Sequence, residues 1–182
     1  AVAAKSPLTG IWAEGDAGGT WGVMLKRAGF DGILIRGKAT EPVYLWVHEQ
    51  GVEIRPAEHL WGKDTFEVAD LIKAETHPKA VVSSIGQAGE NLVRIAVVMS
   101  DGREGRTAGR GGLGAVMGSK NLKAVAVYGT KRPMAAKEED LKTFTKEMVT
   151  AIRDRTQGMS RFGTAGGLQA MEELGDLPIR NW

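Results

Sequence analysis

The chain is organised around residues 106–120, which read Arg106-Thr107-Ala108-Gly109-Arg110-Gly111-Gly112-Leu113-Gly114-Ala115-Val116-Met117-Gly118-Ser119-Lys120. Glycine lacks a Cβ, so backbone N–H groups can approach a ligand closely and positive φ angles are allowed. Arginine offers a fixed fork of donors to phosphate oxygens, and a helix start behind a glycine-rich loop favours anions. Two interpretations stay open here. The loop binds a phosphate-bearing ligand, or it is a tight turn that lets a helix pack close to a sheet.

Another glycine-rich loop lies near the start of the chain. Residues 13–19 read Ala-Glu-Gly-Asp-Ala-Gly-Gly, and the apolar spacing that follows predicts a helix over residues 20–28 with Gly29 as its left-handed cap. The chain therefore contains two units in which glycines come directly before a helix.

The remaining pattern predicts a mixture of short strands and helices. We expect a loop over residues 5–19 and a turn over residues 86–90, a capping box of Asp64 and Glu67, and a hairpin joined by residues 49–51. The expected strands are residues 32–36, 43–48, 52–55, 80–85, 92–99 and 123–128, and the further helices are residues 64–75, 137–155 and 166–174.

Composition narrows the classes of protein. The 182 residues are 42% apolar and carry a formal net charge of +2, which predicts no nucleic-acid partner and no membrane partner. There is no cysteine, so these residues offer no thiolate ligands for zinc or for an iron–sulfur cluster. The first residue is Ala1 rather than Met, and we expect a piece of a longer protein, located in the cytoplasm.

A dinucleotide site is one functional alternative. Residues 109–114 match the pattern G-x-G-x-x-G, but that fold needs a strand leading into the first glycine and an acidic residue about 20 positions later. Lys131 and Arg132 stand there instead, which leaves NADP binding by a βαβ module as the alternative.

Isolated polar residues carry less information. The three histidines are far apart in the sequence and predict no metal site, and Ser83-Ser84 has no base near it in sequence. Arg103, Arg106 and Arg110 are crowded into one loop and repel one another unless anions lie among them. We expect Asp101 and Glu104 to supply part of that negative charge and a bound phosphate to supply the rest.

Several segments resemble the N-terminal domain of tungsten-containing aldehyde:ferredoxin oxidoreductases. They are Ser6-Pro7-Leu8-Thr9-Gly10, residues 15–22, 25–32, 37–39 and 88–92, and above all residues 106–123. Gly163-Thr164 and residues 177–182 resemble the segment where the helical part of that family begins. The similarity covers essentially the whole chain.

The resemblance implies an activity and a set of cofactors. Members of the family oxidise an aldehyde with water to a carboxylate and pass two electrons through a 4Fe-4S cluster to ferredoxin. Their tungsten is held by the dithiolene sulfurs of two pyranopterins, together called tungstopterin, whose phosphates are bridged by Mg²⁺. Magnesium prefers oxygen ligands, and the protein's contribution to such chemistry is to position the cofactor.

The resemblance also assigns site residues. The matching cofactor-binding residues are Asp16, Gly18, Arg106, Thr107, Gly109 and Arg110, and Asp16 and Thr107 are the expected contacts of Mg²⁺. Asp16 stands where the family usually has Asn, which keeps an oxygen but adds a charge. Thr107 stands where Ala is usual, a change that leaves the backbone carbonyl in place.

Together these observations predict an α+β fold in two parts. Residues 1–132 form a mixed β-sheet base that binds tungstopterin and lacks its own N-terminus, and residues 133–182 are the truncated start of a helical domain. The catalytic residues and cluster cysteines lie outside the chain, so we expect the piece alone to be inactive. Expected partners are the remainder of the enzyme, an aldehyde, ferredoxin or an electron-transfer subunit, and further copies in a homo-oligomer. A non-catalytic scaffold that keeps the fold is the other alternative.

Overall fold

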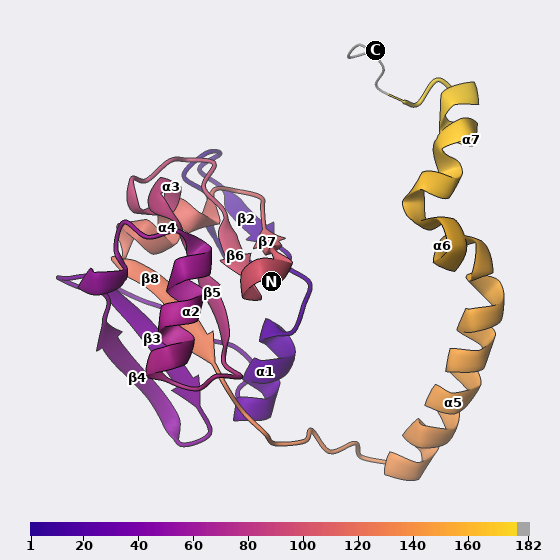
Figure 1. Cartoon of the computed structure of the whole chain (residues 1–182), viewed down its shortest axis with the longest axis horizontal. Coiled ribbons are helices and arrows are strands. Elements are labelled where there is room, and N and C mark those ends of the chain that lie inside the picture. Colours follow the sequence, from indigo (N-terminus) through magenta and orange to yellow (C-terminus); the bar gives the residue numbers. More distant parts are fainter. Residues whose placement is uncertain (178–182) are drawn as a thin grey trace. The chain divides into compact units, whose positions relative to one another are not determined.

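The computed structural model describes residues 1–177 and divides into two compact units (Figure 1). The first comprises residues 1–133 and the second begins at Met134. In the described residues, no helix is both long and apolar enough to cross a membrane.

A six-stranded mixed sheet forms the base of the first unit. Its strands are β3 (Val43–His48), β4 (Gly51–Pro56), β5 (Val81–Ser84), β6 (Val98–Ser100), β7 (Arg106–Ala108) and β8 (Leu122–Val127). They lie in the order β4-β3-β8-β5-β6-β7, with β3 and β8 parallel and all other neighbours antiparallel. The predicted α+β fold on a mixed sheet is confirmed.

The two faces of this sheet bury separate apolar clusters, because side chains alternate along each strand. On β3, Tyr44 and Trp46 join one cluster, and Leu45 and Val47 join the other. Residues of α2 pack in the first cluster, and residues of α1 and α4 pack in the second. The helices of this unit are α1 (Trp21–Ala28), α2 (Thr65–Glu75), α3 (Gln87–Glu90) and α4 (Leu113–Ser119).

The helix signals in the sequence are mostly confirmed. Gly29 ends α1 in a left-handed conformation with φ of 100°. The carboxylate of Asp64 caps α2 by accepting hydrogen bonds from the N–H groups of Phe66 at 2.8 Å and Glu67 at 2.9 Å. The segment expected to be a turn at residues 86–90 contains the short helix α3 instead.

A small two-stranded sheet occupies the region where a loop was expected. It consists of β1 (Val2–Lys5) and β2 (Trp12–Gly15), paired antiparallel, so the prediction of a loop over residues 5–19 is wrong for β2. The turn signal itself is real, because the buried Ser6 hydroxyl accepts hydrogen bonds from the N–H groups of Leu8 and Thr9. The turn signals of residues 6–10 and 15–19 lie directly beside these four-residue strands and hide them in the sequence.

Of two other predicted strands, one is absent and one is only partly present. Residues 32–36 form no strand, although Ile33 and Ile35 still pack against the core. Of residues 92–99, only Val98 and Met99 belong to a strand, β6. Leu92 has φ of 57°, a left-handed conformation that interrupts an extended segment.

The second unit is helical. Its elements are α5 (Glu138–Arg155), α6 (Gln157–Phe162), the 3-10 helix Gly163–Gly167 and α7 (Leu168–Glu173). The predicted helices over residues 137–155 and 166–174 are confirmed within a few residues, whereas α6 was not predicted. Residues 177–182, which resemble part of the segment where the family's helical part begins, lie outside the described residues, except for Leu177.

A buried ion pair connects the central strand to α3. Lys123 on β8 has a fully buried side chain and pairs with Glu90, whose side chain is 4% exposed. The ammonium group also donates to the carbonyl of Lys63 at 2.9 Å, and the carboxylate accepts from the N–H group of Gly62 at 2.9 and 3.0 Å. Each buried charge is thus compensated, as burial of ions requires.

This pair makes a prediction about stability. Lys123→Met alone leaves the carboxylate of Glu90 buried without its cation, and we expect a loss of about 3–5 kcal/mol in the free energy of unfolding. The double variant Lys123→Met, Glu90→Gln removes both charges and should lose less than the sum of the two single variants. Chemical denaturation of all four proteins measures this coupling, and strictly additive losses would contradict it.

Candidate functional site

The loop that follows β7 needs glycine at two positions for steric reasons. We call residues 106–112, which comprise β7 and the residues between β7 and α4, the second loop. Gly111 and Gly112 have φ of 74° and 68°, which side chains rarely adopt. A Cβ at Gly112 would lie 1.9 Å from the carbonyl oxygen of Arg94, and one at Gly111 would lie 2.5 Å from the Cβ of Ala13. These two glycines therefore serve packing.

The same reason applies inside α4. A Cβ at Gly114 would lie 2.4 Å from the carbonyl oxygen of Val97, and one at Gly118 would lie 1.9 Å from the carbonyl oxygen of Gly89. The helix therefore packs directly on the backbone of two other segments, which holds its first turn and the second loop in place.

Gly109 differs from these glycines. It is exposed, its φ is not positive, and a Cβ there would be only in ordinary contact, 3.6 Å from Thr107. No packing requirement explains a glycine at this position. Each of the two interpretations of the sequence therefore applies to different residues. Close packing explains the glycines of residues 111–118, whereas Gly109 leaves exposed backbone for a ligand.

The two glycine-rich loops lie against each other. We call residues 15–19 the first loop. A Cβ at Gly15 would lie 3.3 Å from Ala108, and one at Gly18 would lie 3.9 Å from the Cδ of Arg106. Asp16 and Thr107 fall between these two contacts along their segments. The structure thus brings together residues that are about 90 positions apart in the sequence.

Charged groups at the two loops fall into paired and unpaired sets. Arg103 pairs with Asp70 at 3.4 Å, and Asp101 accepts hydrogen bonds from Thr20. Asp101 therefore forms no direct ion pair with the loop arginines within the described residues, and its role in balancing their charge stays a prediction. The side chains of Asp16, Arg106 and Arg110 form no ion pair or hydrogen bond within the described residues, and all three residues are exposed. Two arginines with unpaired guanidinium groups thus stand on either side of Gly109 in the sequence, and the stem of one of them, Arg106, lies beside Gly18.

Thr107 is held differently. Its hydroxyl is directed at the sulfur of Met99 at 3.0 Å and at the carbonyl of Gly105 at 3.2 Å, so its proton is engaged within the protein. It lies on β7, which is an edge strand of the sheet, and edge strands keep backbone groups without a strand partner.

The oxygen ligands at the two loops suit a magnesium ion that is held partly by phosphates better than one held by protein side chains alone. The described residues contain no group of three or more His, Cys, Asp or Glu side chains that could hold a metal. Magnesium is often bound through one or two carboxylates together with substrate phosphates. The exposed carboxylate of Asp16 and the backbone oxygens beside it suit that mode.

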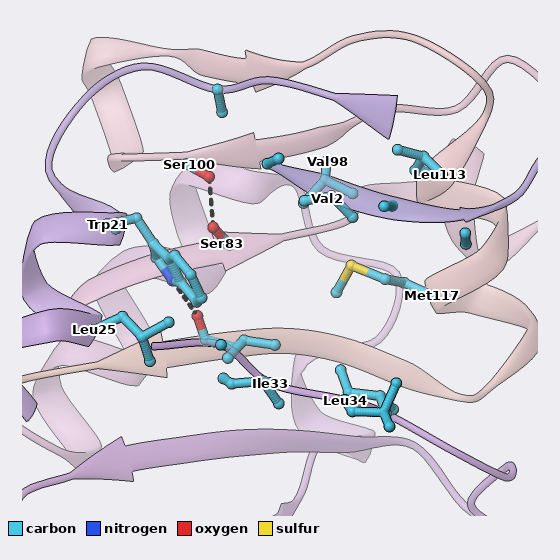
Figure 2. A pocket seen from close by; sticks show the side chains of 18 of the residues that line it. Val2, Trp21, Leu25, Ile33, Leu34, Ser83, Val98, Ser100, Leu113 and Met117 are labelled. Atoms are coloured by element: carbon cyan, nitrogen blue, oxygen red, sulfur yellow. Dashed lines mark hydrogen bonds between the residues drawn. The ribbon is translucent and has the colours of Figure 1, made fainter. Parts of the chain in front are cut away.

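A cavity of about 530 Å³ opens beside the first loop (Figure 2). Its walls come from β1, α1 and the sheet, and they are mostly apolar. Ser83 and Ser100 face each other at the wall with their hydroxyl oxygens 2.5 Å apart, and the indole N–H of Trp21 donates to the carbonyl of Val125. Ser83 thus has a serine rather than a base as its partner, which argues against its being a nucleophile.

The charged lining residues of this cavity are also engaged. Lys26 pairs with Asp31, and Lys120 donates to the carbonyl of Gly37 at 2.9 Å. Arg106 and Arg110 of the second loop form no such side-chain contact within the described residues, and together with the exposed backbone of Gly109 they make this loop the candidate anion site.

The sheet does not have the topology of a dinucleotide-binding fold. That fold joins two parallel strands through a helix. Here β7, α4 and β8 follow one another, but the alternation β8-β5-β6-β7 makes β7 antiparallel to β8 and separates the two strands in the sheet. Lys131 lies at the far end of α1 from Thr20, with its N–H bonded to the carbonyl of Arg27. The NADP alternative loses its structural basis.

Comparison with known proteins identifies the fold. Residues 1–129 match the family model of the aldehyde ferredoxin oxidoreductase N-terminal domain. The chain belongs to this family.

Relatives of the chain cover several substrates. It is 43% identical to tungsten-containing aldehyde ferredoxin oxidoreductases of Pyrococcus furiosus and Thermococcus kodakarensis, and 38% identical to the WOR-like subunit of an aliphatic sulfonate oxidoreductase of Pyrococcus furiosus. Each alignment covers the whole chain but only 30% or 31% of the relative. The solved active-site complex BamBC of benzoyl coenzyme A reductase matches 86% of the chain and 24% of its own chain, with a TM-score of 0.81 and 44% identity.

Sequence reasoning overlooked one residue of this region. The sequence suggests only a charge-balancing role for Asp101, whereas its carboxylate accepts a hydrogen bond from the N–H group of Thr20, 81 positions away. No local pattern signals such a contact, because its partner is fixed only when β6 and the first loop come together.

The division of the glycines can be tested by substitution. Gly112→Ala places a Cβ against a carbonyl oxygen at positive φ, and we expect a loss of about 1–3 kcal/mol in the free energy of unfolding. Gly109→Ala meets only ordinary contacts and should change stability by less than about 0.5 kcal/mol. Thermal and chemical unfolding of both variants provides the measurement, and equal losses would contradict the division.

Proposed function

We propose that this chain forms the part of a tungsten-containing aldehyde:ferredoxin oxidoreductase that cradles the tungstopterin. One observation carries the proposal. Two glycine-rich loops from distant parts of the chain meet, and these loops carry an exposed glycine without a packing role, two unpaired arginines and an unpaired carboxylate. Backbone N–H groups and guanidinium groups together suit phosphate oxygens.

Each proposed residue has a role that fits its environment. Arg106 and Arg110 neutralise phosphate charge, and Gly109 and Gly18 let backbone approach the pterin closely. Asp16 and an oxygen of Thr107 contact the Mg²⁺ ion between the phosphates. When bound, the tungstopterin supplies the two-electron chemistry that converts an aldehyde and water to a carboxylate. These residues of the chain bind and orient it.

Other parts of such an enzyme would supply what these residues lack. The chain spans about 30% of the length of the tungsten-containing relatives and contains no cysteine. We therefore assign the 4Fe-4S cluster, the substrate pocket and the surface for ferredoxin or another electron-transfer subunit to segments outside it. A cytoplasmic homo-oligomer is part of the same proposal.

A non-catalytic scaffold is the second candidate. The observation that favours it is the departure at both proposed magnesium contacts, Asp16 and Thr107, from the residues usual in the family. Tungsten, molybdenum and pterin content of the protein purified anaerobically from its native host decides between the two candidates. A protein without any of these would support the scaffold.

The arginine at the start of the second loop gives a direct test. In the full-length protein, Arg106→Ala removes a charged donor to phosphate, which is worth about 1.5–3 kcal/mol of binding. We expect a lower ratio of tungsten and pterin to protein, measured by elemental analysis and by fluorescence of the oxidised pterin. Arg103→Ala is the matched control, because Arg103 pairs with Asp70 instead, and unchanged metal content in Arg106→Ala would count against the site.

Asp16 tests the proposed magnesium contact separately. Asp16→Ala removes the side-chain oxygen, so we expect magnesium content to fall, whereas Asp16→Asn keeps an oxygen ligand and should retain the ion. Elemental analysis of magnesium in both full-length variants gives the readout. Equal magnesium content in the Ala and Asn variants would remove Asp16 from the site.

A further inference from the structure

One carboxylate joins the residue after the first loop to the turn that leads into the second loop. Asp101 follows β6 and accepts hydrogen bonds from the N–H group of Thr20 at 3.0 and 3.2 Å and from its hydroxyl at 2.7 Å. Thr20 directly follows the first loop and is the N-cap residue of α1. Within the described residues, these are the only hydrogen bonds between residues 13–20 and residues 99–112. We call this contact the Asp101 clamp.

The clamp occupies space that the sequence keeps free. Gly19 has φ of 87°, and a Cβ there would lie 1.7 Å from a carboxylate oxygen of Asp101 and 2.8 Å from the Cγ of Arg106. Any side chain at position 19 would therefore displace the carboxylate and the aliphatic stem of the arginine together. Asp101 itself has φ of 61°, which costs energy outside glycine but is tolerated best by Asp and Asn.

The clamp also directs the carboxylate of Asp101 toward α1 rather than toward Arg106. The carboxylate lies at the N-terminal end of α1, where the partial positive charge of the helix favours it. Helix α1 has no acidic residue in its first turn, and Thr20 makes no side-chain capping bond of its own. Asp101 thus turns to α1, and within the described residues it does not pair with Arg106. The guanidinium group of Arg106 is left for an anion.

We propose that Asp101 is a positioning residue of the cofactor site, which sets the spacing of the first and second loops and keeps Arg106 unpaired. The inference rests on the proposed function, because it assumes that the two loops bind one cofactor. It predicts that the two halves of the cradle separate when the clamp is removed, even though each loop keeps its own residues.

Substitution at position 101 in the full-length protein tests this. Asp101→Gly keeps a residue suited to positive φ but removes the clamp, and we expect a severalfold loss of tungsten, pterin and magnesium per protein. Asp101→Asn keeps one acceptor and the backbone conformation and should restore most of the cofactor. Thr20→Val removes only the hydroxyl bond, so its loss should be intermediate. It also remains informative if Asp101→Gly does not fold.

A second clamp in the same chain offers a matched control. The carboxylate of Glu49 accepts hydrogen bonds from the N–H group of Thr130 at 2.5 Å and from its hydroxyl at 2.6 Å. The partners are again 81 residues apart, but they lie at the other end of α1, near Arg27. Glu49→Ala should lower the unfolding temperature without loss of cofactor. If it loses as much cofactor as Asp101→Gly, the role of Asp101 is only structural and the proposal is wrong.

Comparison with Arg106→Ala separates this inference from the proposed function. If Arg106→Ala loses cofactor and Asp101→Gly retains it, the loops bind the cofactor but Asp101 does not position them. If both variants retain it, the proposed function fails as well. Loss in both, with rescue by Asp101→Asn and retention in Glu49→Ala, supports the inference.

Discussion

The second loop is held in place by a buried charge on the central strand. Every residue of β8 is buried, including Lys123, and a buried ammonium is stable only with a partner. Glu90 supplies that partner and thereby fixes α3 on the sheet. Because α3 is fixed, the carbonyl oxygen of Gly89 stands where only a glycine of α4 can pass it, at Gly118. The position of α4 then sets the position of the loop before it, from Gly112 back to Gly109.

The same chain of contacts explains why the site can be electropositive without destabilising the fold. The buried charge of Lys123 has its partner within the unit, in Glu90. The cations at the second loop are exposed, and exposed charges are stabilised by water and cost little to leave unpaired. Their guanidinium groups can therefore stay hydrated and available to bind an anion. A phosphate then replaces water rather than an internal partner, so binding does not have to break an ion pair.

Elements with their own local signals could be predicted from the sequence. Asp64 predicts the start of α2 as its N-cap residue, and Gly29 predicts the end of α1. The alternation of apolar and polar residues on both sides of Gly51 predicts the hairpin of β3 and β4. The strands β1 and β2 could not be predicted, because they are short and depend on tertiary contacts, namely their pairing with each other and the packing of Val2, Ala4 and Ala13 on the core. The candidate site shows the same limit. Its residues could be named from a resemblance, but the clamp between Thr20 and Asp101 depends on tertiary contact and has no pattern along the chain.

The range of relatives fits the division of labour that the structure suggests. Proteins named for the oxidation of aldehydes, for aliphatic sulfonates and for benzoyl coenzyme A share this unit at 38–44% identity. A site that recognises phosphates and a metal ion needs backbone N–H groups, arginines and an oxygen ligand, and none of these depends on the substrate. Substrate choice depends on the shape and polarity of the pocket around the reacting atoms. Under the proposed function, a unit that binds the cofactor can therefore stay the same while a substrate pocket built by other segments changes.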